Sequence, residues 1–184
     1  MRFKKRLIVI TLQFIPISSL YYRFLHLRFN QNFVQMKSHS LKESQSRNLI
    51  FLGVLLFLFG LIVGLIVPAL ANPRMGVSSH IEGVMNGMFL VILGLIWTRL
   101  KLSNRWLKIS FWLSIYGTFM NFFGILVAAI FNAGEMLNIA AQGRRGPDFA
   151  ESFVTFSLIS LSLAMIIVSV VILIGLKRGA KYQN

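Results

Sequence analysis

The sequence is too apolar for a soluble protein. Apolar residues make up 56% of its 184 residues and charged residues 13%, with a mean hydropathy of +0.72, whereas charged residues make up about a quarter of a typical soluble chain. The formal net charge of +14 is gathered at the ends of apolar runs, so no nucleic-acid partner is expected. The lack of cysteine excludes disulfides, thiolate metal sites and covalent c-type haem.

Residues 1–48 are expected to form a basic segment before the membrane domain. An apolar stretch over 7–20 is too short to cross a bilayer, and no small-residue cleavage site follows it. Two interpretations stay open. Either the segment lies in the membrane interface, with Arg23 and Arg28 among the headgroups, or translation starts naturally at Met36 and the residues before it, 1–35, do not belong to the native protein.

Four apolar runs follow, each long enough for a hydrocarbon core that takes about 20 helical residues to cross. They predict an all-α integral membrane protein whose four-helix transmembrane domain covers residues 49–178, with a cytoplasmic tail at 179–184. Basic residues at 101–108 and near both ends predict cytoplasmic termini in a multi-pass protein of the cell inner (cytoplasmic) membrane. The four runs are 49–70, 81–100, 106–131 and 149–176.

The connections carry turn and capping signals. Pro68 is expected to end the first helix, and residues 72–76, Asn-Pro-Arg-Met-Gly, are expected to form a turn. Asp148 and Glu151 have the spacing of a capping box, so the fourth helix is expected to start near Phe149.

The first two helices each contain a G-x-x-x-G spacing, at residues 60–64 and 83–87. Glycines at this spacing let helix backbones approach closely in lipid. We therefore expect tight helix packing beside Asn86, which lies within the second of these motifs.

The predicted spans hold few polar side chains, and such groups are costly in lipid and mark functional sites. At about 100° per helical residue, Glu82 and Asn86 share a face, whereas His80 lies about 120° from Asn86. A ligand common to His80 and Asn86 would therefore need a site shared between subunits or a large planar cofactor. The polar set comprises His80, Glu82, Asn86, Tyr116, Thr118 and Asn121.

Each of these side chains also has a structural interpretation. His80 would be an interfacial hydrogen-bonding residue, and Glu82 a first-turn carboxylate at the positive end of the helix dipole. Asn86 and Asn121 would only join helices. The functional interpretation pairs the two asparagines, because Thr118 and Asn121 share a stripe of the third helix that makes Asn121 the best second amide for the site.

Several motifs of the sequence closely resemble hydroxylaminobenzene mutases. The main one is ANPRMGVSSHIEGVMNGMFL at residues 71–90, followed by LGLIW at 93–97, with shorter runs at 116–121 and 160–165. The resemblance covers about residues 47–178. The wider group includes styrene oxide isomerase, which implies a four-helix membrane enzyme that binds haem b between the subunits of a trimer.

The resemblance also implies roles for individual residues. His80, Asn86 and the following glycine match a His-x5-Asn-Gly pattern whose histidine ligates the haem iron. Asn86 and Asn121 match two asparagines of the related isomerase, the first of which helps to hold the substrate. Ile125 stands where that isomerase has a substrate-contacting tyrosine, which favours the mutase over epoxide isomerisation. The residues expected to support this site are Glu82, Thr118 and Tyr116.

We therefore expect an isomerase that moves a hydroxyl group within an aryl hydroxylamine, converting hydroxylaminobenzene to 2-aminophenol. Haem iron on His80 would act as a Lewis acid, and Asn86 and Asn121 would orient the substrate. Two alternatives stay open: an aryl epoxide isomerase, and a non-catalytic small membrane protein that binds haem or a partner. The expected partners are a small aromatic substrate, membrane lipid and further copies of the chain, forming a trimer by resemblance.

Overall fold

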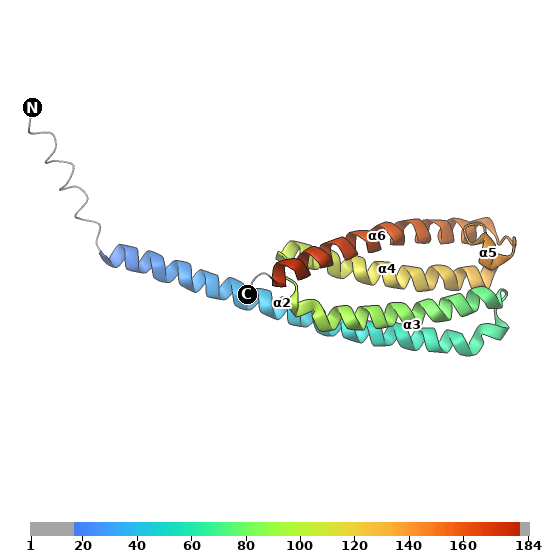
Figure 1. The fold of residues 1–184 in the computed structure, drawn as a ribbon, viewed down its shortest axis with the longest axis horizontal. Coiled ribbons are helices and arrows are strands. Elements are labelled where there is room, and N and C mark those ends of the chain that lie inside the picture. The colour runs from blue at the N-terminus through green and yellow to red at the C-terminus, as the bar shows by residue number, and fades with distance from the viewer. Residues whose placement is uncertain (1–16, 181–184) are drawn as a thin grey trace, which may run out of the picture. The chain divides into compact units, whose positions relative to one another are not determined.

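The structure, a computed structural model, describes the backbone over residues 17–180 and side chains over 39–179, and it is helical with no strand in this part (Figure 1). The chain divides into two compact units, Met1–Ser40 and Leu41–Asn184. The second unit contains the predicted transmembrane domain. This division falls near the expected domain boundary at residue 48, whereas the expected tail lies almost wholly beyond the described side chains.

The first helix, α2, spans Ile17–Ile66 and so begins well before the expected span at residue 49. The sequence has neither Gly nor Pro between residues 17 and 52, so nothing in this stretch favours a break. Residues 1–16 lie outside the described residues, and so do the side chains of Arg23 and Arg28. The two interpretations of the N-terminal segment therefore both stay predictions.

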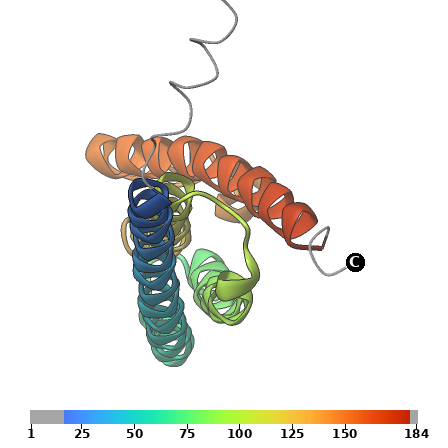
Figure 2. The same ribbon diagram turned by 90° about the vertical axis from the view of Figure 1, so that its left-hand side faces the viewer.

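Four helices are long and apolar enough to cross a membrane, which confirms the predicted bundle. In the second unit, α2 and α3 lie together, and α4 and α6 lie beside each other (Figures 1 and 2). The candidate spans are His39–Ala69, Pro73–Arg99, Asn104–Phe131 and Asp148–Gly179. The remaining helices are η1 (Val67–Ala69), α3 (Pro73–Ile96), η2 (Trp97–Arg99), α4 (Asn104–Phe131), α5 (Asn138–Ala141) and α6 (Asp148–Ala180).

Helix α3 starts at Pro73, earlier than the predicted start at residue 81. The Asn72 side chain caps it by accepting a hydrogen bond from the Met75 backbone N at 3.2 Å, and Pro73 takes the first helical position. The turn predicted at 72–76 is therefore wrong, because Asn-Pro here starts a helix. Glu82 consequently lies well inside α3, so its interpretation as a first-turn carboxylate is also wrong.

The predicted end of the first helix and start of the fourth agree with the structure, but the predicted capping box does not. Helix α2 ends at Ile66, just before Pro68, and α6 starts at Asp148, both close to expectation. The predicted capping box is wrong, because the Glu151 carboxylate accepts its hydrogen bonds from backbone N–H groups of the preceding loop and not from Asp148.

Glycines bring α2 and α3 into backbone contact, as the two G-x-x-x-G spacings predicted. A Cβ atom added to Gly83 would lie 2.5 Å from the Cα of Gly60, and one added to Gly87 would lie 2.6 Å from the backbone N of Phe57. No side chain larger than hydrogen fits at such distances unless the helices separate. The distance between α2 and α3 therefore depends on these glycines.

Polar contacts join the helices to the connection between α3 and α4 at the basic end of the bundle. The Lys42 ammonium donates to the Leu100 carbonyl oxygen at 2.7 Å, and the Lys101 backbone N donates to the Gly175 carbonyl oxygen at 3.1 Å. The middle of α2 around Lys42 and the C-terminal part of α6 therefore both contact the connection between α3 and α4, and the basic stretch 101–108 runs from this connection into the start of α4. That this end is cytoplasmic stays a prediction from the positive charges.

The glycine contact makes a stability prediction. We expect Gly83→Ala to lower the free energy of unfolding in detergent by about 2 kcal/mol, as overpacking of a close contact does. Gly124→Ala is the matched control, since its added Cβ would first meet the Ser157 Cβ at 3.1 Å. Denaturant titration followed by circular dichroism measures the free energy of unfolding of both variants. Equal values for Gly83→Ala and Gly124→Ala would contradict the importance of the α2–α3 contact.

Candidate functional site

Glu82 joins the two asparagines that the sequence singled out. From the next turn of α3, Asn86 Nδ2 donates to Glu82 Oε2 at 3.0 Å, and from α4, Asn121 Nδ2 donates to the same oxygen at 2.5 Å. All three side chains are half-buried. Glu82, Asn86 and Asn121 are called the amide–carboxylate cluster below. The predicted shared face of Glu82 and Asn86 is confirmed, and the structure brings Asn86 and Asn121 together as expected.

The bonding within the cluster fixes which atoms remain available to a ligand. A carboxylate oxygen only accepts hydrogen bonds, so each amide turns its nitrogen toward Glu82 and its carbonyl oxygen elsewhere. Glu82 Oε1 accepts no hydrogen bond from the described side chains. Among the described residues, Ser110 Oγ is the fully buried side-chain polar atom without a hydrogen-bond partner. Glu82 Oε1 also lacks a partner but is not in this fully buried class, so it is accessible.

His80 bonds to a different helix. Its Nδ1 lies 2.8 Å from the Gly60 carbonyl oxygen of α2. Because a carbonyl oxygen only accepts, Nδ1 carries the hydrogen, and in the neutral tautomer that this bond selects Nε2 has the lone pair. Gly64 leaves room for the ring, since an added Cβ there would lie 2.8 Å from Nδ1. The predicted hydrogen-bonding role of His80 is confirmed, while ligation stays a prediction.

The groove beside His80 has a volume of about 600 Å³, within the range of roughly 300–1,000 Å³ for small-molecule sites. A haem needs one axial histidine and apolar walls, and a hydrogen bond on the other ring nitrogen commonly orients such a ligand. His80 and this groove fit that requirement. The lining residues are Leu61, Gly64, Leu65, Val67, Pro68, Val77 and His80.

Among the described residues, no group of three or more His, Cys, Asp or Glu side chains lies close enough together to hold a metal ion without a cofactor. Haem differs because its porphyrin supplies four of the ligands of the iron. A single histidine such as His80 is therefore sufficient on the protein side.

His80 and the amide–carboxylate cluster lie on different sides of α3. His80 bonds to α2, whereas Glu82, two residues and thus about 200° further along the helix, bonds to Asn121 of α4. The two groups do not converge within one chain. The angular separation predicted from the sequence is therefore confirmed by their partners.

The other predicted residues bond elsewhere. The Tyr116 hydroxyl lies 2.7 Å from Ser160 Oγ of α6, and Thr118 Oγ1 donates to the Ser114 carbonyl oxygen at 2.8 Å. Neither hydrogen-bonds to the amide–carboxylate cluster among the described contacts, so their supporting roles stay predictions. Ile125 is buried at 6% exposure.

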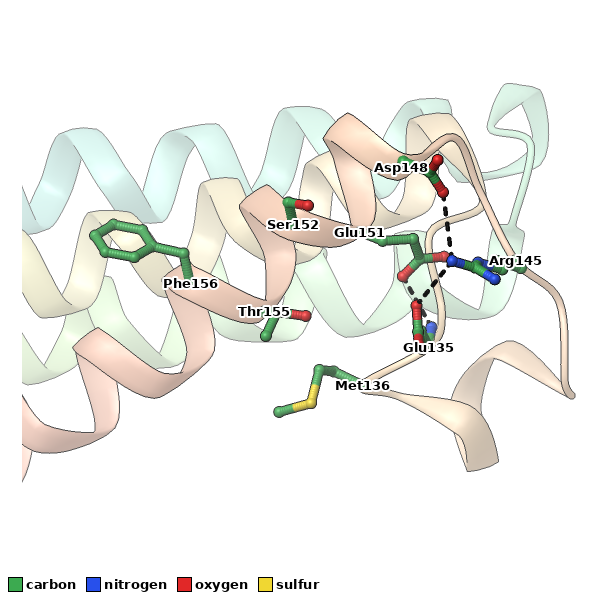
Figure 3. Close-up of a pocket in the computed structure, with 8 residues that line it drawn as sticks. All are labelled: Glu135, Met136, Arg145, Asp148, Glu151, Ser152, Thr155 and Phe156. Carbon is green, nitrogen blue, oxygen red and sulfur yellow. Dashed lines mark hydrogen bonds and ion pairs between the residues drawn. The ribbon is translucent and has the colours of Figure 1, made fainter.

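Sequence reasoning missed the role of Glu151, which anchors the loop between α4 and α6. Its carboxylate, 4% exposed, accepts backbone N–H groups of Gly134 at 3.0 Å, Glu135 at 3.0 Å and Gly146 at 2.7 Å. Figure 3 shows it pointing toward this loop, where Arg145 pairs with Glu135. The available signal was an acidic residue in an apolar helix directly after a glycine-rich loop.

Comparison with known proteins now identifies the family. The family model described as styrene oxide isomerase matches residues 45–177, which include His80 and the whole amide–carboxylate cluster. The chain belongs to this family. It is an isomerase with four helices capable of spanning a membrane, and the resemblance found in the sequence is thereby confirmed.

Two relatives narrow the resemblance within the family. Hydroxylaminobenzene mutase HabB of Ectopseudomonas oleovorans is 45% identical over 140 residues, which cover 76% of this chain and 85% of the relative. Hydroxylaminobenzene mutase HabA of the same organism is 46% identical over 127 residues, which cover 68% of this chain and 94% of the relative. No solved structure matches the chain.

The Glu151 anchor predicts a change in loop order. We expect Glu151→Ala to release the 134–146 loop, because three hydrogen bonds to a charged group are worth on the order of 3 kcal/mol or more. Trypsin should then cut after Arg144 or Arg145 at least about tenfold faster, read by mass spectrometry. Glu135→Ala, which removes an exposed carboxylate from the same loop, is the control. Equal cleavage rates for the wild-type protein and both variants would contradict the role of Glu151 in holding the loop.

Proposed function

We propose that the protein is a mutase for aryl hydroxylamines in the inner membrane, converting hydroxylaminobenzene to 2-aminophenol. The observation that carries this proposal is the identity of 45–46% to two relatives named hydroxylaminobenzene mutase. The amide–carboxylate cluster supports it, because it places hydrogen-bonding groups suited to a hydroxylamine inside a predicted span.

The proposed reaction is an isomerisation that needs no oxidant, reductant or second substrate. The N–O bond breaks and a C–O bond forms at the ortho carbon of the ring. That carbon loses its hydrogen as a proton, and the nitrogen gains a proton, so atoms and electrons balance within one molecule. The protein's part is to bind the substrate, orient it and keep water from the reacting ring.

Asn86 and Asn121 would do the orienting. Their nitrogens are held by Glu82, so their carbonyl oxygens are free to accept hydrogens from the N–H and O–H of the substrate. Two such contacts, from α3 and α4, would hold the hydroxylamine group at a fixed angle to its ring. Surrounding apolar side chains would exclude the water that would otherwise compete for the electron-poor ring.

We further propose that haem b binds at His80, with Nε2 as the ligand atom and the Nδ1–H···O bond to Gly60 fixing the ring. When bound, the iron would supply Lewis acidity that weakens the N–O bond. Since His80 and the amide–carboxylate cluster diverge around α3, the haem side of one copy and the cluster of another would together form the site. This arrangement favours a homo-oligomer, a trimer by similarity to styrene oxide isomerase.

The family description favours a second candidate, an aryl epoxide isomerase. Ile125 disfavours the epoxide isomerase, because this buried apolar side chain occupies the position where the resemblance places a substrate-contacting tyrosine. The third alternative, a non-catalytic membrane protein, is not supported, since both relatives carry the names of enzymes.

Turnover of the purified, haem-supplied protein tests the proposal. We expect hydroxylaminobenzene to yield 2-aminophenol and styrene oxide to react at least about a hundredfold more slowly, with chromatography measuring both products. Reaction of styrene oxide alone would instead support the second candidate, and reaction of neither would overturn the proposed function.

The haem proposal has its own test. We expect His80→Ala to lose the Soret absorption band and at least about a hundredfold in turnover, because no other described side chain is placed to replace the ligand. His39→Ala, which changes an exposed histidine of α2, is the matched control and should keep both. Full turnover in haem-free protein would contradict the role of the iron.

A further inference from the structure

We propose that Glu82 determines substrate specificity by binding a donor hydrogen of the substrate through Oε1. The site would then accept aryl compounds that carry an N–H or O–H group next to the ring and would disfavour compounds, such as epoxides, that carry acceptors only. This inference rests on the proposed function and assigns its selectivity to one residue.

Two hydrogen bonds fix the direction of the Glu82 carboxylate. Asn86 holds Oε2 from the same helix and Asn121 holds it from α4, so rotation of the carboxylate would break at least one bond. With Oε2 occupied twice, Oε1 is the free oxygen, and it is accessible in a half-buried position within a predicted span. A polar oxygen left without a hydrogen bond is costly there, which favours a ligand that supplies one.

Neither helix capping nor an ion pair explains this carboxylate, and its two hydrogen bonds use only one of its oxygens. Glu82 lies inside α3 and so caps no helix end. No ion pair joins Glu82 to a described cation, unlike Glu135 and Asp148, which both pair with Arg145. A carboxylate kept within a span without a cation is typical of a functional site.

The geometry favours a donor substrate over an acceptor substrate. Three oxygens of the cluster can accept from a ligand, namely Glu82 Oε1 and the carbonyl oxygens of Asn86 and Asn121, and a carboxylate oxygen is the strongest acceptor of the three. The N–H and O–H of a hydroxylamine meet this set directly. An epoxide oxygen facing Oε1 would bring two acceptors together with no hydrogen between them, and sites built on such a contact reject the wrong partner strongly.

Binding of two matched ligands isolates this effect from turnover. 4-Fluoroaniline carries N–H donors, whereas 4-fluoro-N,N-dimethylaniline has the same ring and nitrogen without them. Fluorine NMR titration of the full-length protein in detergent, corrected with protein-free micelles, gives both dissociation constants. We expect the wild-type protein to prefer 4-fluoroaniline by about tenfold or more.

Two variants then test Glu82 itself. Glu82→Gln keeps the shape of the side chain, and while its carbonyl accepts from both asparagines its N–H2 group replaces Oε1 with a donor. The preference for 4-fluoroaniline should then fall well below the wild-type ratio, to what the two asparagine carbonyls supply. Glu82→Leu removes both oxygens and should also lower the ratio of the two dissociation constants well below its wild-type value. Glu135→Gln, an exposed loop carboxylate, is the control and should keep the wild-type ratio.

The outcomes separate this inference from the proposed function. A wild-type ratio in folded Glu82→Gln, with helicity and elution volume unchanged, would overturn the role of Glu82 and would leave the proposed function, which is tested on the wild-type protein, untouched. A wild-type protein without preference between the ligands would overturn it as well. Absence of turnover with the binding preference present would instead overturn the proposed function and leave the donor selectivity of Glu82 in place.

Discussion

The close glycine contact between α2 and α3 is the constraint on which the rest of the site depends. With Gly60 and Gly83 almost touching, the carbonyl oxygen of Gly60 comes within reach of His80, and Gly64 leaves space for the imidazole ring. The same contact fixes the rotation of α3, which directs Glu82 toward α4. A wider spacing would lose the hydrogen bond of His80 and loosen the register of the amide–carboxylate cluster.

The cost of polar groups in lipid explains how the few polar side chains are arranged. His80 uses one ring nitrogen on a backbone carbonyl, and Asn86 and Asn121 share one carboxylate oxygen, so most of the polar atoms in this region have partners. The described atoms left without a partner are Nε2 of His80, Oε1 of Glu82 and the carbonyl oxygens of Asn86 and Asn121. The proposed function uses these atoms: Nε2 would ligate the haem iron, and the oxygens would accept hydrogens from the substrate.

Much of this arrangement was predictable from the sequence because helix periodicity and residue cost are local properties. Hydropathy gave the four spans, and the spacing of residues 80, 82 and 86 gave their relative directions. The contacts that depend on chain segments far apart were not predictable: Glu82 as the common acceptor for both asparagines, and Glu151 as the anchor of a loop. The start of α3 was mispredicted because Asn72-Pro73 suits a turn as well as a helix start.

An apolar site that holds the hydroxylamine and excludes water requires that the hydroxyl group stay with its own molecule. Isotope labelling measures this most directly: hydroxylaminobenzene carrying oxygen-18 is converted in ordinary water, and mass spectrometry reads the label in 2-aminophenol. Retention of essentially all the label is the predicted result. Replacement of the label by solvent oxygen would contradict an intramolecular transfer and, with it, the proposed mutase mechanism.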